Sequence, residues 1–215
     1  MKKLGIGCGI IGALAILVLI VVAIAGGSYN RLVGLSQSVD KQWSQVQNVY
    51  QRRADLVPNL VATVSGAANF EKSTLTEVTA ARASVGQVKI SPESAPADAE
   101  KLAEFDRAQG QLSSALSRLL VVSERYPELR ATQNFQTLQA QLEGTENRIS
   151  VERGRFNETV QAYNTAVKSF PAVLYAGIFG FRPKPYFNAA PNAEVAPKVQ
   201  FDFNKPGSST EPAAK

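Results

Sequence analysis

Side chains that usually carry out enzymatic chemistry are scarce in this sequence. The chain has no histidine and a single cysteine, Cys8. A nucleophile activated by histidine therefore cannot be built from it, and the usual zinc and haem ligands are missing. Because no glycine-rich phosphate loop is found either, chemistry by carboxylates or lysines is the remaining enzymatic alternative. We predict that the protein is not an enzyme and binds no cofactor or metal.

Charged residues within apolar stripes are the first candidates for a functional role. Arg53 interrupts a stripe of apolar residues at helical spacing, and Asp55 lies two positions further on. Glu146, Arg148 and Glu152 flank a second apolar seam. Because an unpaired buried charge is heavily penalised, these residues are expected to form a buried polar layer between facing helices, which fixes their register. In the alternative, the Arg53 side chain extends along the stripe to water.

An aromatic segment that is rich in glycine and proline follows the last predicted helix. Its large side chains include Tyr175, Phe179, Phe181, Tyr186 and Phe187. Exposed apolar patches usually mark surfaces that bind a partner or a membrane, so these five residues are the candidate interaction surface. In the alternative, the rings pack back over the end of the helical domain.

These candidate residues are held by an N-terminal membrane segment and a helical domain. Residues 4–27 include no charged side chain. As a helix this segment would span roughly 36 Å, enough to cross a hydrocarbon core about 30 Å thick. Residues 1–28 are therefore predicted to form a transmembrane anchor that contacts the lipid bilayer through residues 4–27. A cleaved signal peptide ending at Ala23-Ile24-Ala25 is the alternative, which the length of the apolar run disfavours.

Three small residues of the anchor, Gly5, Gly9 and Ala13, lie on one helix face. This spacing occurs in closely paired transmembrane helices and predicts a homo-oligomer, although it also arises by chance.

The orientation of the anchor follows from the cations that flank it. Lys2 and Lys3 precede the span, and Arg31 is the only cation among the first dozen residues after it. This bias predicts a cytoplasmic N-terminus, with the rest of the chain on the periplasmic or extracellular side of a bacterial membrane.

Residues 29–187 are predicted to form an all-α domain. A helix containing Pro58 is expected to kink there and to reverse between Gly66 and Phe70. A loop is predicted over 86–98, with Asp98 capping the next helix. A last helix is expected to start just after Pro127 and to end at Pro171.

The number of helices follows from their lengths. An unbroken helix over residues 31–85 would exceed about 80 Å, with too little partner surface to cover its apolar stripe. The prediction is therefore an N-terminal transmembrane helix followed by an antiparallel four-helix bundle. The alternative has three helices, the first long and kinked. Residues 188–215 are expected to form an extended, largely disordered tail.

Several blocks of the sequence, in order, resemble the LemA protein family. The resemblance covers about residues 29–187 and implies a bacterial protein with one N-terminal membrane helix and a bundle of four helices. A related branch takes part in building magnetosome membranes, which implies a link to membrane assembly, and no catalytic residue is transferred. The blocks are Tyr29-Asn30-x-Leu32-Val33, Val39-Asp40-x-x-Trp43-Ser44-Gln45-Val46, Gln51-Arg52-Arg53-x-Asp55-Leu56-Val57-Pro58-Asn59-Leu60-Val61, Gly66-Ala67-Ala68-x-Phe70-Glu71, Glu124-x-Tyr126-Pro127-x-Leu129, Thr145-Glu146-Asn147-Arg148-Ile149, Tyr163-Asn164 and Phe170-Pro171.

The expected function is that of a membrane-anchored scaffold or interaction protein of the bacterial cell envelope, with an unknown envelope protein as partner. Membrane remodelling or binding to a lipid surface is the first alternative, and a carboxylate-based enzyme is the second. The net charge is +5, with acidic and basic residues interspersed, so nucleic acid is not an expected partner.

Overall fold

The fold is taken from a computed structural model that describes residues 2–67, 70–88 and 90–188, with backbone alone at 2–11 and 21. These residues form helices and no strand, so the all-α prediction is confirmed. The predicted disordered tail lies outside the described residues, apart from Asn188. The elements are α1 (Lys2–Ser65), α2 (Lys72–Gln87), α3 (Ala99–Ser123), α4 (Pro127–Arg130), α5 (Gln133–Lys168) and a 3-10 helix, η1 (Ala172–Leu174).

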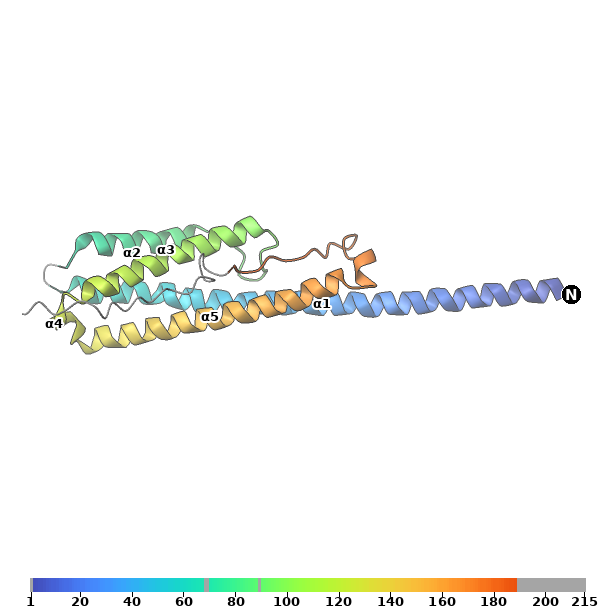
Figure 1. The fold of residues 1–215 in the computed structure, drawn as a ribbon, viewed down its shortest axis with the longest axis horizontal. Coiled ribbons are helices and arrows are strands. Elements are labelled where there is room, and N and C mark those ends of the chain that lie inside the picture. The colour runs from blue at the N-terminus through green and yellow to red at the C-terminus, as the bar shows by residue number, and fades with distance from the viewer. Residues whose placement is uncertain (1, 68–69, 89, 189–215) are drawn as a thin grey trace, which may run out of the picture.

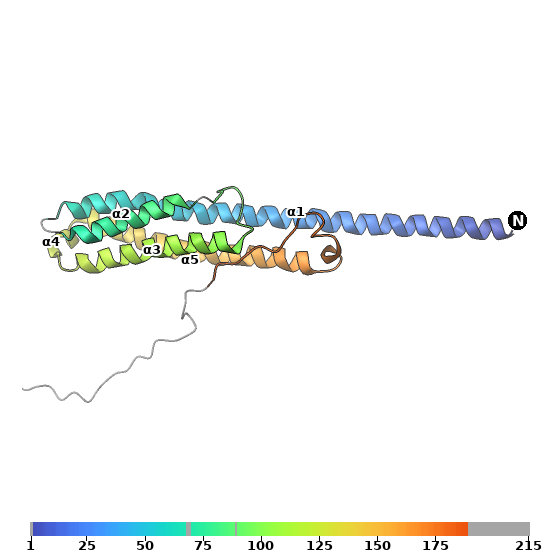
Figure 2. The same cartoon turned by 90° about the horizontal axis from the view of Figure 1, so that it is seen from above.

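Four of these helices lie side by side with alternating directions. The second half of α1 packs along α5, and α2 packs along α3 (Figures 1 and 2). The chain reverses after Ser65 and again between Gln87 and Ala99. This arrangement is consistent with the predicted antiparallel four-helix bundle.

Helix α1 is longer than the bundle and projects from it as a stalk (Figure 1). It continues without a break through residues 28 and 29 and through Pro58. Within the described part of the chain, it is the one helix long and apolar enough to cross a membrane, and none of its most apolar window is buried. Such a segment satisfies its backbone hydrogen bonds internally, which a lipid environment requires.

The ends of the helices agree with most of the sequence-based expectations. The first reversal lies between Ser65 and Lys72, within the expected region. Asp98 is the N-cap of α3, and its carboxylate accepts a hydrogen bond from the Glu100 amide at 3.0 Å. A helix N-cap of this kind satisfies one of the amides that have no partner within the helix.

The prediction that the last long helix starts just after Pro127 was wrong. The short helix α4 occupies Pro127–Arg130, and α5 begins only at Gln133. The break arises because Thr132 is extended and caps α5, its hydroxyl accepting a hydrogen bond from the Phe135 amide at 3.4 Å. The turn chemistry of threonine therefore divides what the apolar pattern presents as one helix.

The core consists of two clusters of buried residues. The proximal cluster, at the end of the bundle next to the stalk, is rich in aromatic rings, and the distal cluster is mostly aliphatic. The proximal cluster includes Trp43, Tyr50, Phe105, Phe156, Tyr163 and Phe187. The distal cluster includes Val57, Leu60, Val64, Leu112, Leu116, Leu119 and Leu142.

Candidate membrane-proximal site

Arg53 of α1 is buried, with 1% of its surface exposed, and it joins three helices. Its Nη1 donates to the Glu146 carboxylate of α5 at 2.6 Å and to the Ser113 hydroxyl of α3 at 2.6 Å. Its Nη2 donates to the side chain and to the backbone carbonyl of Gln109 on α3. The guanidinium is therefore bound inside the bundle instead of extending to water.

The other residues of the predicted polar layer lie elsewhere. Asp55 is exposed and accepts a hydrogen bond from Gln51, and Arg148 is exposed. Glu152 pairs with Arg155 on its own helix at 2.8 Å and accepts a hydrogen bond from Gln42. Among the five predicted residues, the structure thus brings together Arg53 and Glu146.

Gln109 and Ser113, which complete the layer, were not among the sequence-based candidates. They are four residues apart in α3 and therefore lie on one face of that helix. Gln109 stands between Phe105 and Leu112 in an otherwise apolar stripe, and it is 4% exposed. A polar residue inside an apolar stripe was the signal that found Arg53, and the same signal would have found Gln109.

The polar layer stands between the two core clusters. On α1, Tyr50 belongs to the proximal cluster and Val57 to the distal one, with Arg53 between them. On α5, Ile149 and Leu142 lie on either side of Glu146 in the same way. Burial raises the pKa of Tyr50, which borders this layer, and the nearby Arg153 and Arg53 oppose that rise.

The far half of the aromatic segment, residues 181–188, packs back onto the bundle. Phe187 is buried against Trp43, Phe105 and Phe156. Phe181 is half-buried against the proximal cluster, whereas Tyr186 is exposed. The rings of Phe187 and Phe181 therefore pack back onto the helical domain, which was the alternative interpretation of this segment.

Two asparagines of α5 hold this extended segment (residues 181–188) by its backbone. The Asn164 amide donates to the Lys184 carbonyl and accepts from the Lys184 amide, both at 2.8 Å. Asn157 forms the same pair of bonds with Phe187, at 3.0 and 2.9 Å. The Lys184 ammonium also pairs with Asp40 of α1 at 2.8 Å. Asparagine suits this task because its side chain both donates and accepts, as a backbone peptide does.

The near half of the segment forms a compact loop at the base of the stalk, which we call the membrane-proximal loop (residues 169–180). Tyr175 is half-buried, and its hydroxyl donates to the Ala25 carbonyl of α1 at 3.4 Å. The Phe179 ring lies edge-on to Tyr29, with 5.4 Å between centroids. Phe179 nevertheless stays 61% exposed, and Ile178 is 83% exposed. The loop therefore presents apolar side chains outward.

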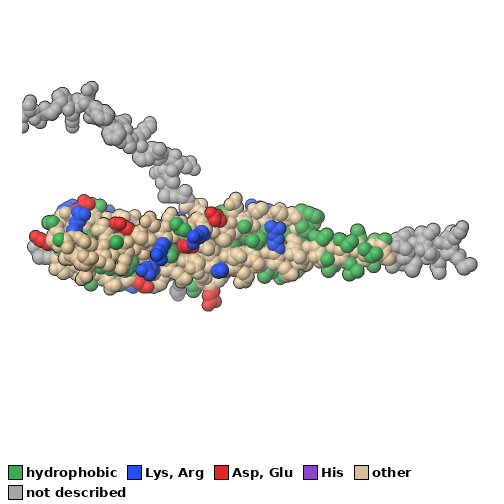
Figure 3. Space-filling model, turned by 90° about the horizontal axis from the view of Figure 1, so that it is seen from below, with side chains coloured by type: hydrophobic (Ala, Val, Ile, Leu, Met, Phe, Trp, Pro, Cys, Tyr) green, Lys and Arg blue, Asp and Glu red, His purple; other side chains and the backbone are tan. Residues whose placement is uncertain are grey.

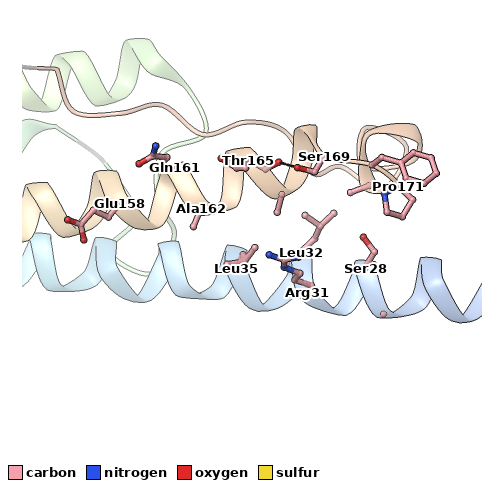
Figure 4. Close-up of a pocket in the computed structure, with 14 residues that line it drawn as sticks. Ser28, Arg31, Leu32, Leu35, Glu158, Gln161, Ala162, Thr165, Ser169 and Pro171 are labelled. Carbon is pink, nitrogen blue, oxygen red and sulfur yellow. Dashed lines mark hydrogen bonds between the residues drawn. The ribbon is translucent and has the colours of Figure 1, made fainter.

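A groove of about 620 Å³ lies between α1 and α5 next to this loop (Figure 4). Ser28 and Arg31 line it from α1, Thr165 lines it from α5, and Ser169 lines it from the start of the loop. Arg31 is exposed, and no ion pair of this side chain is found among the described residues. The groove thus offers a cation, hydroxyl groups and the Glu158 carboxylate close to the base of the stalk.

The predicted face for self-association cannot be placed in the same detail. The side-chain surroundings of Gly5 and Gly9 lie outside the described residues, and Ala13 is exposed on the stalk. Pairing of stalks through these residues stays a prediction.

The sequence is similar to one protein-family profile and to several known proteins. The profile of the LemA family matches residues 42–201. Magnetosome protein MamQ of Magnetospirillum gryphiswaldense is 31% identical over 41% of this chain and 32% of its own length. MamQ 2 of Paramagnetospirillum magneticum is 28% identical over 78% of this chain and 67% of its own. Protein LemA of Metamycoplasma hominis is 24% identical over 69% of this chain and 60% of its own. The match thus covers about a third of the first relative and about two thirds of the others.

Proposed function

This chain belongs to the LemA family, and on that premise we propose that it is a non-enzymatic scaffold anchored in a bacterial cytoplasmic membrane, with its bundle on the outer side. The observation that carries the proposal is the continuity of α1, which runs from the apolar stalk into the bundle without a break. A continuous helix transmits position and orientation better than a flexible linker does. The bundle would therefore be held at a fixed place above the bilayer.

The reach of this scaffold follows from helix geometry. From the end of the apolar run to Ser65, α1 rises by roughly 55 Å at 1.5 Å per residue. Helix α5 packs beside this part of α1, and α2 also contacts it, so neighbouring helices stiffen it (Figure 2). A partner in the envelope would thus meet a rod-shaped surface that extends well beyond the lipid headgroups. The MamQ relatives are named as magnetosome proteins, which supports a role at a membrane.

Crosslinking in living cells tests the scaffold proposal. Two large apolar side chains of the bundle are exposed away from the stalk, Val121 on α3 and Val151 on α5. A photo-crosslinking amino acid at either position should yield an adduct with one defined envelope protein, identified by mass spectrometry. The matched control is Thr79, an exposed position on α2. Repeated trials that yield no adduct, or the same abundant proteins from every position, would contradict the proposal.

Binding to a lipid surface is a second candidate function, because one specific observation favours it. The membrane-proximal loop exposes apolar side chains directly beside the stalk. A scaffold and a lipid-binding protein are compatible, since the positions proposed for partner contact, Val121 and Val151, lie outside the membrane-proximal loop.

A further inference from the structure

We propose that the membrane-proximal loop inserts its apolar side chains into the interfacial region of the bilayer that α1 crosses, on the side of the bundle. The protein would then hold the membrane at two places, the span and the loop. This inference rests on the proposed anchoring by α1 and adds a lipid contact made by a distant part of the chain.

The loop concentrates the exposed apolar surface of the bundle. Among described residues outside α1, eight large apolar side chains are exposed, and five of them fall within ten consecutive positions. These five are Phe170, Val173, Leu174, Ile178 and Phe179. Figure 3 shows hydrophobic side chains over the stalk and the adjoining end of the bundle, with charged groups over the rest of that face. A contiguous patch of this kind marks a surface that meets an apolar partner.

The position of the loop along α1 identifies that partner as the membrane. Its contacts on the stalk are the Ala25 carbonyl, bound by Tyr175, and the Tyr29 ring, which meets Phe179. Residues 25–29 straddle the end of the apolar run at residue 27, where a spanning helix leaves the hydrocarbon core. Tyrosine is enriched at this depth because its ring is apolar and its hydroxyl is polar. The loop therefore lies at the level of the lipid headgroups.

The backbone of the loop is prepared for an apolar environment. The Ala176 amide donates to Ala172 at 2.8 Å, and the Phe181 amide donates back to Ala176 at 2.9 Å. The amides of residues 173–175 and 178–180 likewise donate to carbonyls within the loop or the preceding turn. Gly180 closes the loop with a φ of +81°, a conformation that side chains disfavour. Because these amides are already bonded, transfer out of water leaves few donors unpaired.

Two exposed cations lie near the apolar patch, and acidic residues are sparse around it in the sequence. No Asp or Glu occurs before Asp40 or between Glu158 and Glu194, and Glu158 itself lines the groove that holds Arg31. Asp40 itself pairs with Lys184. Arg31 in the groove and Lys168 at the end of α5 are exposed, and both would face lipid phosphates at this depth. An apolar patch with a basic rim is the usual composition of a surface that binds anionic membranes.

An environment-sensitive fluorophore on the full-length protein tests the proposal. Replacing Cys8 with Ser leaves no cysteine, so single cysteines can be introduced at exposed positions without altering the core. Three labelled variants are compared in liposomes: Ile178→Cys in the loop, Val121→Cys on the bundle and Leu17→Cys on the stalk. The probe is a nitrobenzoxadiazole group, and lipids with brominated acyl chains serve as quenchers.

We expect blue-shifted, bromine-quenched emission from the probes at Ile178 and Leu17, and water-like, unquenched emission at Val121. A lipid-like signal at Leu17 with a water-like signal at Ile178 would overturn the loop contact while leaving the anchoring in place. A water-like signal at Leu17 would overturn both. A lipid-like signal at all three positions would also contradict the inference, since the loop would then not differ from the rest of the bundle surface.

Discussion

At the distal end of the bundle, exposed charges pair across helices, whereas at the membrane-proximal end exposed apolar side chains predominate. Arg125 pairs with Glu71, and Arg118 with Glu77, each at 3.0 Å. The ring of Phe70 packs on Tyr126 over the turn between helices. At the other end, Leu174 and Ile178 project outward with no such cover. The distal end thus presents paired charges, which suit contact with water, whereas the proximal end presents exposed apolar side chains, which do not.

The buried clusters behind the two ends also differ in the kind of side chain they contain. The distal cluster is mostly aliphatic and is built from helices, with Phe135 of α5 and Leu129 of α4 among its buried members. The proximal cluster is rich in aromatic rings, and Phe187 from the extended segment completes it. That segment continues directly from the membrane-proximal loop. A short stretch of chain therefore connects the loop, for which we propose a lipid contact, to the buried ring of Phe187. The predictions below test this difference between the ends.

The largest effect is expected from Trp43→Ala. The Trp43 ring is fully buried, touches three phenylalanine rings and donates through Nε1 to the Ser91 carbonyl at 3.0 Å. Truncating a buried tryptophan leaves a cavity, so the free energy of unfolding should fall by about 3–5 kcal/mol. Denaturant unfolding in detergent micelles measures it. A fall below about 1 kcal/mol, the size of an ordinary surface or single hydrogen-bond change, would show that the aromatic cluster does not stabilise the proximal half.

Arg53→Met tests the polar layer between the two halves. The substitution leaves Gln109 buried without its partner, which should lower the free energy of unfolding by about 1–3 kcal/mol. Glu146 adds less to this loss because its side chain is 40% exposed and water can solvate it. Arg52→Met is the matched control, because Arg52 is exposed; a change within about 0.5 kcal/mol is expected there. An unchanged or raised melting temperature for Arg53→Met would contradict a stabilising layer.

Asn164→Ala tests the attachment of the extended segment (residues 181–188) to α5. Losing both hydrogen bonds to Lys184 should lower the free energy of unfolding by about 1–2 kcal/mol. Hydrogen exchange of the Lys184 amide should accelerate, because that amide donates to the Asn164 side chain. Asn147→Ala, at an exposed position of the same helix, should change neither quantity. Equal rates of hydrogen exchange at the Lys184 amide in both variants would show that other contacts hold the extended segment.

The smallest effect concerns alkaline pH. Burial raises the pKa of Tyr50 above its ordinary value of 10.0, so the folded state holds this proton more tightly than the unfolded state does. The resulting stabilisation is complete below the unfolded pKa and is lost as pH rises through the folded one. The protein should therefore lose stability above about pH 10, and Tyr50→Phe should lessen that loss. Unfolding curves recorded between about pH 8 and pH 11, a range that brackets the ordinary tyrosine pKa, would compare the free energy of unfolding of the two proteins.

Much of the fold could be predicted from the sequence because it depends on local patterns. The apolar repeat located α3 and α5, and Gly66 marked the first reversal. The break between α4 and α5 was missed because Thr132 keeps the apolar pattern in register while it caps the start of a new helix, α5. Spacing predicts where an apolar face lies, but a single capping bond can still divide the helix.

The candidate site was less predictable because its contacts join distant parts of the chain. The sequence identified Arg53 and Glu146, but not the pairing of Arg53 with Gln109. It also identified the aromatic segment, but it could not show that Phe187 turns inward while Ile178 points outward. Phe187 turns inward onto the rings of Trp43, Phe105 and Phe156. The loop that carries Ile178 is held at residues 25–29, roughly 150 positions earlier in the chain. Periodicity carries no information across such a separation.

Labelling of single cysteines in intact cells tests the central claim most directly. In a chain with Cys8→Ser, cysteines are placed at Thr79 on the bundle and at Ile178 in the loop, both exposed in the structure. A maleimide that cannot cross the cytoplasmic membrane should label the cysteine at position 79 in intact cells. It should label the cysteine at position 178 only after detergent removes the lipid. Labelling of position 79 only after lysis would place the bundle in the cytoplasm, and equal labelling of both positions in intact cells would remove the lipid contact.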